Sequence, residues 1–143
     1  MSKYTDRPFT QTRVSSKRAK GRGADDMNIS ERTIGDVVVV DVSGKITLTD
    51  GGDTILKDKL RSLVQQGHRK LLLNLADVTY IDSSGLGAIV QSYTTVTNQG
   101  GGLKLLNMTK RIHDLLAITK LLTVFDTFDN EAEAVTSFSA ARV

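Results

Sequence analysis

Two neighbouring serines follow an aspartate in the run Asp82-Ser83-Ser84-Gly85-Leu86, which we call the serine segment. An apolar run from Lys70 to Leu75 precedes it and indicates a β-strand, whereas apolar residues at helical spacing follow it from Ser84 to Asn98. Asp82 and Ser83 therefore fall where helix N-caps are expected. Because the free amides and partial positive charge of a helix N-terminus accept a phosphate well, a serine here is a candidate phosphoacceptor.

Helix capping, catalysis and nucleotide binding are the alternatives to phosphorylation as the role of the serine segment. Capping of the helix by Asp82 or Ser83 explains the segment by itself and does not exclude phosphorylation, which would add about −1.5 to −2 charges. A nucleophilic Ser83 or Ser84 with His113 as its base is disfavoured, because the chain has no Gly-x-Ser-x-Gly elbow. Nucleotide-binding glycine motifs are also absent from the sequence. We therefore predict that the chain is not an enzyme and holds no cofactor.

Composition sets further bounds on the class of protein. The 143 residues include no cysteine and two histidines, which argues against a structural metal site. Since no apolar run approaches the roughly 18 to 20 residues of a membrane span, a cytoplasmic protein is expected. Seven of the first 23 residues are basic and one is acidic, whereas the rest of the chain is mildly acidic. We expect a basic, flexible extension over residues 1–26, no direct DNA binding, and one folded domain over residues 27–143.

The pattern along the chain predicts alternating strands and helices. A hairpin around Gly35-Asp36 comes first, then one helix, and then three strand–helix pairs. The order is therefore β-β-α-β-α-β-α-β-α. This order is typical of an α/β protein with a mostly parallel mixed sheet and helices packed on it, whose functional residues lie at the carboxyl ends of the strands. The expected elements after the hairpin are a helix at 54–66 capped by Asp53 or Thr54, a strand at 70–75, a helix at 84–98, a strand at 103–106, a helix capped by Thr109, a strand at 124–128, and a helix capped by Asp129 or Asn130.

At the level of whole motifs, the chain resembles the STAS domain family of anti-anti-sigma factors, which regulate bacterial sporulation and general stress. The run from Leu73 to Gly87 matches the central signature of that family, and Gly100 to Leu106 resembles its next strand. The resemblance extends from about Asn28 to Phe138 and implies a STAS-type fold. One departure is Thr47, which stands where the family often has an acid in Gly-x-Leu-Asp.

The resemblance also implies a function and a set of site residues. In such proteins the first serine after the aspartate, here Ser83, is phosphorylated by an anti-sigma factor that is also a serine kinase, and a serine phosphatase removes the phosphate. The unphosphorylated form binds the anti-sigma factor and frees sigma for transcription, while Asp82 would orient the serine hydroxyl or assist proton removal, and the ATP and magnesium belong to the kinase. The partner-binding residues implied are the serine segment, Asp82, Ser83, Ser84, Gly85 and Leu86, together with Lys45, Thr47, Thr49 and Asp50.

Two alternatives keep the fold but not the switch. The chain could be a scaffold subunit of a larger signalling assembly, or the partner subunit of a lipid-transport ATPase. Weak association between copies of this chain is a further alternative. Copurification with a kinase-like anti-sigma factor, rather than with a transporter or a multimeric ring, would separate these functions.

Overall fold

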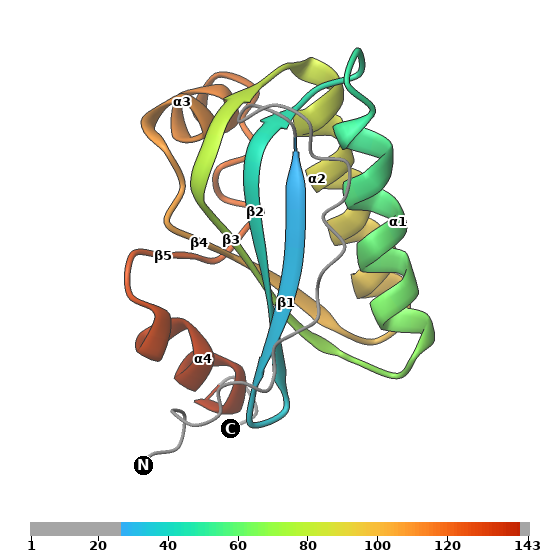
Figure 1. Ribbon diagram of the computed structural model, residues 1–143. Coiled ribbons are helices and arrows are strands. Elements are labelled where there is room, and N and C mark those ends of the chain that lie inside the picture. Colours follow the sequence, from blue (N-terminus) through green and yellow to red (C-terminus); the bar gives the residue numbers. More distant parts are fainter. Residues whose placement is uncertain (1–26, 141–143) are drawn as a thin grey trace.

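A five-stranded mixed sheet in the order β1-β2-β3-β4-β5 forms the centre of the protein, as the computed structural model shows for residues 27–140 (Figure 1). β1 pairs antiparallel with β2, and every other neighbouring pair is parallel. The predicted α/β class and order of elements are confirmed. The strands are β1 (Asn28–Ile34), β2 (Val37–Ile46), β3 (Lys70–Ile81), β4 (Gly102–Leu106) and β5 (Thr127–Phe128).

Helices cover both faces of this sheet. α1 (Gly52–Gln65) and α2 (Ser83–Asn98) lie side by side on one face, and α4 (Glu131–Ala140) lies on the other (Figure 1). α3 (Lys110–Ile118) follows β4 and buries Ile112 and Leu116 in the same apolar cluster that α1 and α2 enter.

The alternation of side chains along β2 explains the two layers. Val38, Val40 and Val42 point into the cluster under α1 and α2, whereas Val37 and Val39 belong to the smaller cluster under α4. Because successive side chains of a strand point to opposite faces, an unbroken valine run suits a central strand that is buried on both sides.

Polar contacts fasten α4 to its face of the sheet. The Arg32 guanidinium binds Asp41 on β2, with Nε 2.6 Å from Oδ2, and also Glu131 at the start of α4, with Nη2 2.8 Å from Oε1. The Asp41 bond is the main reason that the pKa of Arg32 is raised. On β4, the Lys104 ammonium donates to Ser137 Oγ at 2.9 Å and lies 4.6 Å from the centre of the Phe138 ring. These contacts join both ends of the helix to the sheet.

Two predicted strands differ in length from the observed ones. β3 runs on to Ile81, beyond the predicted end at Leu75, because its last residues pair with the end of β2 across a register shift. β5 is shorter than the predicted strand at 124–128. The amide of Val124 donates to Leu121 in a turn, and Phe125 turns inward to meet the Tyr93 ring edge-on at 4.9 Å.

The first helix begins earlier than predicted and without a side-chain cap. Gly51, in the left-handed region with φ of 75°, precedes α1, whereas Asp53 or Thr54 was expected in this place. A turn in which the Gly51 amide donates to Leu48 reverses the chain here, and the Asp53 amide then donates to Thr47. Glycine adopts this conformation at no steric cost. The caps expected at Thr109 and Asn130 are confirmed by bonds to the amides of Ile112 and Glu133.

The basic extension expected over residues 1–26 and the last residues of the expected domain, 141–143, lie outside the described part of the chain. Within residues 27–140, no helix is long and apolar enough to cross a membrane.

Candidate functional site

The serine segment begins at the carboxyl end of β3 and forms the first turn of α2. Asp82 is extended and acts as the N-cap, since its Oδ1 accepts a hydrogen bond of 2.8 Å from the Gly85 amide. Ser83 is therefore the first helical residue rather than the cap, and it is exposed. Of the two cap candidates, the structure selects Asp82 and leaves the Ser83 hydroxyl on the surface.

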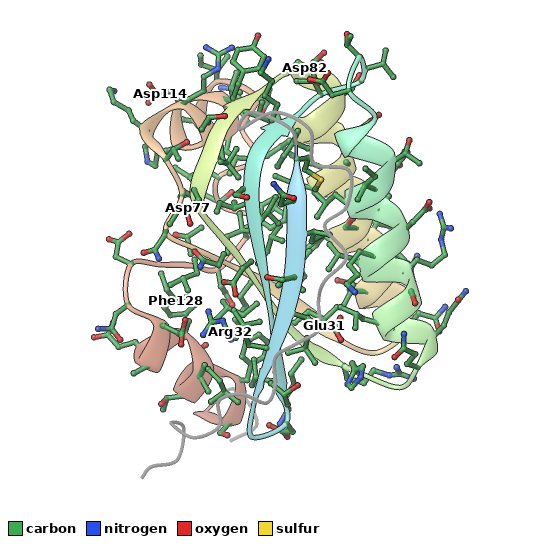
Figure 2. The ribbon with its side chains drawn as sticks, in the orientation of Figure 1. Glu31, Arg32, Asp77, Asp82, Asp114 and Phe128 are labelled. Carbon is green, nitrogen blue, oxygen red and sulfur yellow. The ribbon has the colours of Figure 1, made fainter. Side chains whose placement is uncertain are left out.

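The Asp82 carboxylate also contacts a second segment of the chain. Its Oδ2 accepts a hydrogen bond of 3.2 Å from the amide of Leu48, in the loop between β2 and α1. Figure 2 shows Asp82 at the end of the molecule where this loop and the start of α2 meet. The Gly85 amide, followed by the Leu48 amide and others, stabilises the charged form and lowers the pKa of Asp82, so the side chain is ionised at neutral pH.

Gly85 allows α2 to approach β2 closely. A Cβ atom at this position would lie 2.1 Å from the Ile46 carbonyl oxygen and 2.7 Å from the side chain of Ile81. Only a residue without a side chain fits such an approach. The buried glycine therefore brings the first turn of α2, with Ser83 on it, against the end of β2.

The loop that follows β2 is held by its own side chains. The Thr47 hydroxyl donates to Asp50 Oδ2 at 3.1 Å and accepts from the Asp50 amide at 3.2 Å. Thr47 itself is only 6% exposed. At the position where the family often has an acid, this chain thus has a buried threonine that holds the carboxylate of Asp50 beside it.

The two predicted segments meet at one groove of about 660 Å³, at the carboxyl ends of β2 and β3. Four predicted residues from the β2–α1 side and Asp82 from the serine segment line it, together with two residues that sequence reasoning missed. Those two, Thr79 and Tyr80, lie in the part of β3 beyond its predicted end, where a regular apolar pattern is lost. The lining residues are Lys45, Thr47, Thr49, Asp50, Thr79, Tyr80 and Asp82.

The other members of the serine segment do not line the groove. Ser84 is partly buried, whereas Gly85 and Leu86 are buried at the base of α2. Leu48 lies among the predicted binding residues of the β2–α1 loop, projects from this loop and is 65% exposed.

His113, the candidate base for a nucleophilic serine, lies on a different helix from the serine segment. His113 is exposed on α3, and its Nδ1 lies 3.6 Å from Asp114. Among the described residues, no group of three His, Cys, Asp or Glu side chains could hold a metal ion.

Known proteins with similar sequences share one family. The family model described as the STAS domain matches residues 28–134. An anti-sigma-B factor antagonist of Bacillus subtilis is 38% identical over 89 residues, which cover 62% of this chain and 79% of the relative. An anti-sigma-B factor antagonist of Staphylococcus epidermidis is 32% identical over 95 residues, covering 66% of this chain and 86% of the relative.

Solved structures of other proteins share the fold of this chain. An anti-sigma factor antagonist from Mycobacterium paratuberculosis superposes with a TM-score of 0.71 at 20% identity, covering 82% of this chain and 97% of the other. The phosphorylated form of the Bacillus cell fate determinant SpoIIAA superposes with a TM-score of 0.62 at 18% identity, covering 76% of this chain and 97% of the other. The sequence relatives are named for antagonising an anti-sigma factor rather than for a reaction, in agreement with the prediction that the chain is not an enzyme. From its first sheet strand to the start of its last helix, the chain belongs to the STAS domain family.

Proposed function

We propose that this STAS protein is an anti-sigma factor antagonist that is switched by phosphorylation at Ser83. In its unphosphorylated form it binds an anti-sigma factor that has serine kinase activity, and a serine phosphatase restores this form after phosphorylation. The names of the sequence relatives support the antagonist role. The position of Ser83 supports the switch.

The observation that carries the proposal is the exposed Ser83 at the first position of α2. In the described part of the chain, no protein group forms a hydrogen bond with the Ser83 hydroxyl, because the neighbouring Asp82 occupies the cap position instead. A kinase can therefore reach the hydroxyl without opening the fold. A phosphate at this place would also meet the positive end of the helix dipole, which lowers the cost of the modification to the folded state.

Phosphorylation would change the binding face mainly through charge. The phosphate would stand beside the carboxylate of Asp82 and near the groove that also holds Asp50. A partner that binds the uncharged Ser83 would have to accommodate about −1.5 to −2 further charges at its interface after phosphorylation. A loss of about 2.8 kcal/mol of binding free energy would weaken the complex roughly a hundredfold.

Asp82 has a narrower role in this proposal than proton transfer. Both carboxylate oxygens already accept backbone amide bonds, and the pKa of Asp82 is lowered from its usual value. A carboxylate with a lowered pKa is a weaker base, so it is poorly suited to remove the serine proton. We propose that Asp82 fixes the backbone that carries Ser83, and that the kinase supplies the base.

The experiment starts from the protein isolated from its native cell. Mass spectrometry of the region from Tyr80 to Lys104 would show whether phosphate is present, and on which residue. Calorimetry with the purified anti-sigma factor would then compare wild type, Ser83→Ala and Ser83→Asp, with Ser84→Asp as the matched control.

The proposal expects phosphate at Ser83, and it expects that Ser83→Asp weakens binding at least tenfold while the fold is retained. The control Ser84→Asp changes a partly buried residue. When only the folded protein is counted, it should weaken binding less than Ser83→Asp does. Absence of phosphate during both growth and stress, with unchanged affinity of Ser83→Asp, would contradict the switch. The non-switching scaffold and transport-subunit functions would then be favoured.

A further inference from the structure

Leu48 is an exposed apolar side chain whose backbone is held on both sides. Its amide donates to Asp82 Oδ2 at 3.2 Å, and its carbonyl accepts from the Gly51 amide at 3.1 Å. The preceding residue, Thr47, is buried and bonded to Asp50. A loop fixed in this way presents Leu48 in a defined position, although the side chain is 65% exposed and makes no contribution to either apolar cluster.

The bond to Leu48 joins this loop to the residue next to Ser83. One Asp82 oxygen holds the first turn of α2 through Gly85, and the other holds the loop through Leu48; we call this pair of bonds the Asp82 clamp. Since Asp82 and Ser83 are adjacent, the clamp fixes Leu48 relative to the candidate phosphorylation site. The bond to Gly85 caps the helix, whereas the bond to Leu48 fixes an exposed apolar side chain that packs in neither apolar cluster, which suits a function in binding.

We propose that Asp82 is a positioning residue that fixes Leu48 as an apolar anchor, which enters an uncharged apolar pocket of the anti-sigma partner. This inference rests on the proposed function and specifies its binding face. An anchor that is already held in its bound conformation loses less conformational entropy when it is buried. A protein pocket is favoured over a lipid surface because, in the groove beside the anchor, the carboxylates of Asp50 and Asp82 outnumber the ammonium of Lys45, and anionic lipid would repel this net negative charge.

The anchor also gives the phosphate a physical means of action. A phosphate on Ser83 would stand at the rim of the pocket that receives Leu48. An apolar pocket cannot solvate a charge, so closing the interface would require partial desolvation of the phosphate. The complex would dissociate although Leu48 and its loop keep their conformation.

The first test uses the full chain alone and measures amide hydrogen exchange at Leu48 and Gly85 by NMR. Asp82→Asn retains one carbonyl oxygen, which can still cap α2 because asparagine is as good an N-cap as aspartate. Its other group is an amide nitrogen, which donates and cannot accept from the Leu48 amide. We expect exchange at Leu48 to become at least tenfold faster in Asp82→Asn, with exchange at Gly85 within threefold of wild type.

A control variant, Asp82→Ala, should accelerate exchange at both amides, since it removes both acceptors. If both amides keep their wild-type exchange rates in Asp82→Asn, the clamp is refuted, whatever the partner of the protein is. The second test measures affinity for the purified anti-sigma factor by calorimetry.

Leu48→Ala should weaken binding at least tenfold without changing the melting temperature. Ile118→Ala, which truncates a side chain that is 76% exposed on α3, should stay within twofold of wild type. Equal affinities of Leu48→Ala and wild type would refute the anchor. Failure of the wild-type chain to bind any anti-sigma factor would instead refute the proposed function, while the exchange measurement would still decide the clamp.

Discussion

The two glycines in the first half of α2 offer a direct test of how the site is assembled. A Cβ atom at Gly85 would lie 2.1 Å from the Ile46 carbonyl oxygen, whereas a Cβ atom at Gly87 would meet nothing within 4 Å. Gly85→Ala and Gly87→Ala make the same chemical change two residues apart in one helix. Any difference between them therefore reports the contact with β2 rather than helix propensity.

The size of the difference follows from two opposing effects. Replacing glycine by alanine inside a helix favours folding by about 1 kcal/mol, and this is the whole expected effect of Gly87→Ala. Overpacking typically costs about 1–3 kcal/mol and occasionally more, and a backbone oxygen at the end of a paired strand cannot rotate away as a side chain can. With a contact cost of about 3 kcal/mol or more, Gly85→Ala should be destabilised by about 2 kcal/mol or more.

Urea unfolding followed by circular dichroism would measure both free energies, provided that the transitions are two-state. For a domain of this size, a loss of about 2 kcal/mol in the free energy of unfolding lowers the melting temperature of Gly85→Ala by roughly 10 °C. The melting temperature of Gly87→Ala should instead rise by a few degrees. If Gly85→Ala proves as stable as wild type to within about 0.5 kcal/mol, the close approach of α2 to β2 is wrong. The position of Ser83 beside the end of β2 and the Asp82 clamp would then both be unsupported, because each depends on this close approach.

Three further predictions concern α4, the cap and the extension. Lys104→Ala should lower the free energy of unfolding by about 2 kcal/mol, because the Lys104 side chain is 11% exposed and its loss removes the hydrogen bond to Ser137 and the contact with the Phe138 ring; urea unfolding at pH 7 measures this, and an unchanged stability would show that the Lys104 contacts do not help to hold α4. The pKa of Asp82 is lowered, chiefly by the Gly85 amide, so its ionisation stabilises the folded state above the unfolded pKa of about 3.9, and this contribution disappears as pH falls through the lower folded pKa. Wild type should therefore lose stability more steeply than Asp82→Asn below about pH 4, and parallel curves in urea titrations at pH 5, 4 and 3 would contradict the assignment. Deletion of residues 1–24 should leave the melting temperature within about 2 °C of wild type, because this basic stretch of the sequence has almost no apolar periodicity with which to enter a core; calorimetry would reveal a larger decrease if the extension packs on the domain.

Sequence reasoning succeeded where one local pattern settled the structure. The valine run in β2, the apolar residues at helical spacing in α2 and the caps at Thr109 and Asn130 each indicate the local conformation. It failed at two element ends for different reasons. The end of β3 is set by pairing with the distant strand β2, whereas the start of α1 is set by a local turn at Gly51 and the bond from Asp53 to Thr47.

The candidate site shows the same division. The type and order of residues in the serine segment were sufficient to identify Ser83 as a phosphorylation candidate and to predict a helix start beside it. Thr79 and Tyr80 could not be assigned to the site in this way, since they meet the β2–α1 loop only through contacts between segments about 30 residues apart.

The sequence by itself determined the order of strands and helices, the α/β class and the resemblance to the STAS domain, because these depend on periodicity and on one continuous motif. Tertiary structure alone decided that Gly85 admits the helix to the end of β2, and that the Asp82 carboxylate joins the first turn of α2 to the β2–α1 loop. The physical reason is that a close approach and a bridging hydrogen bond between distant segments each depend on distances in space. Those distances exist only after the sheet has brought the ends of β2 and β3 together.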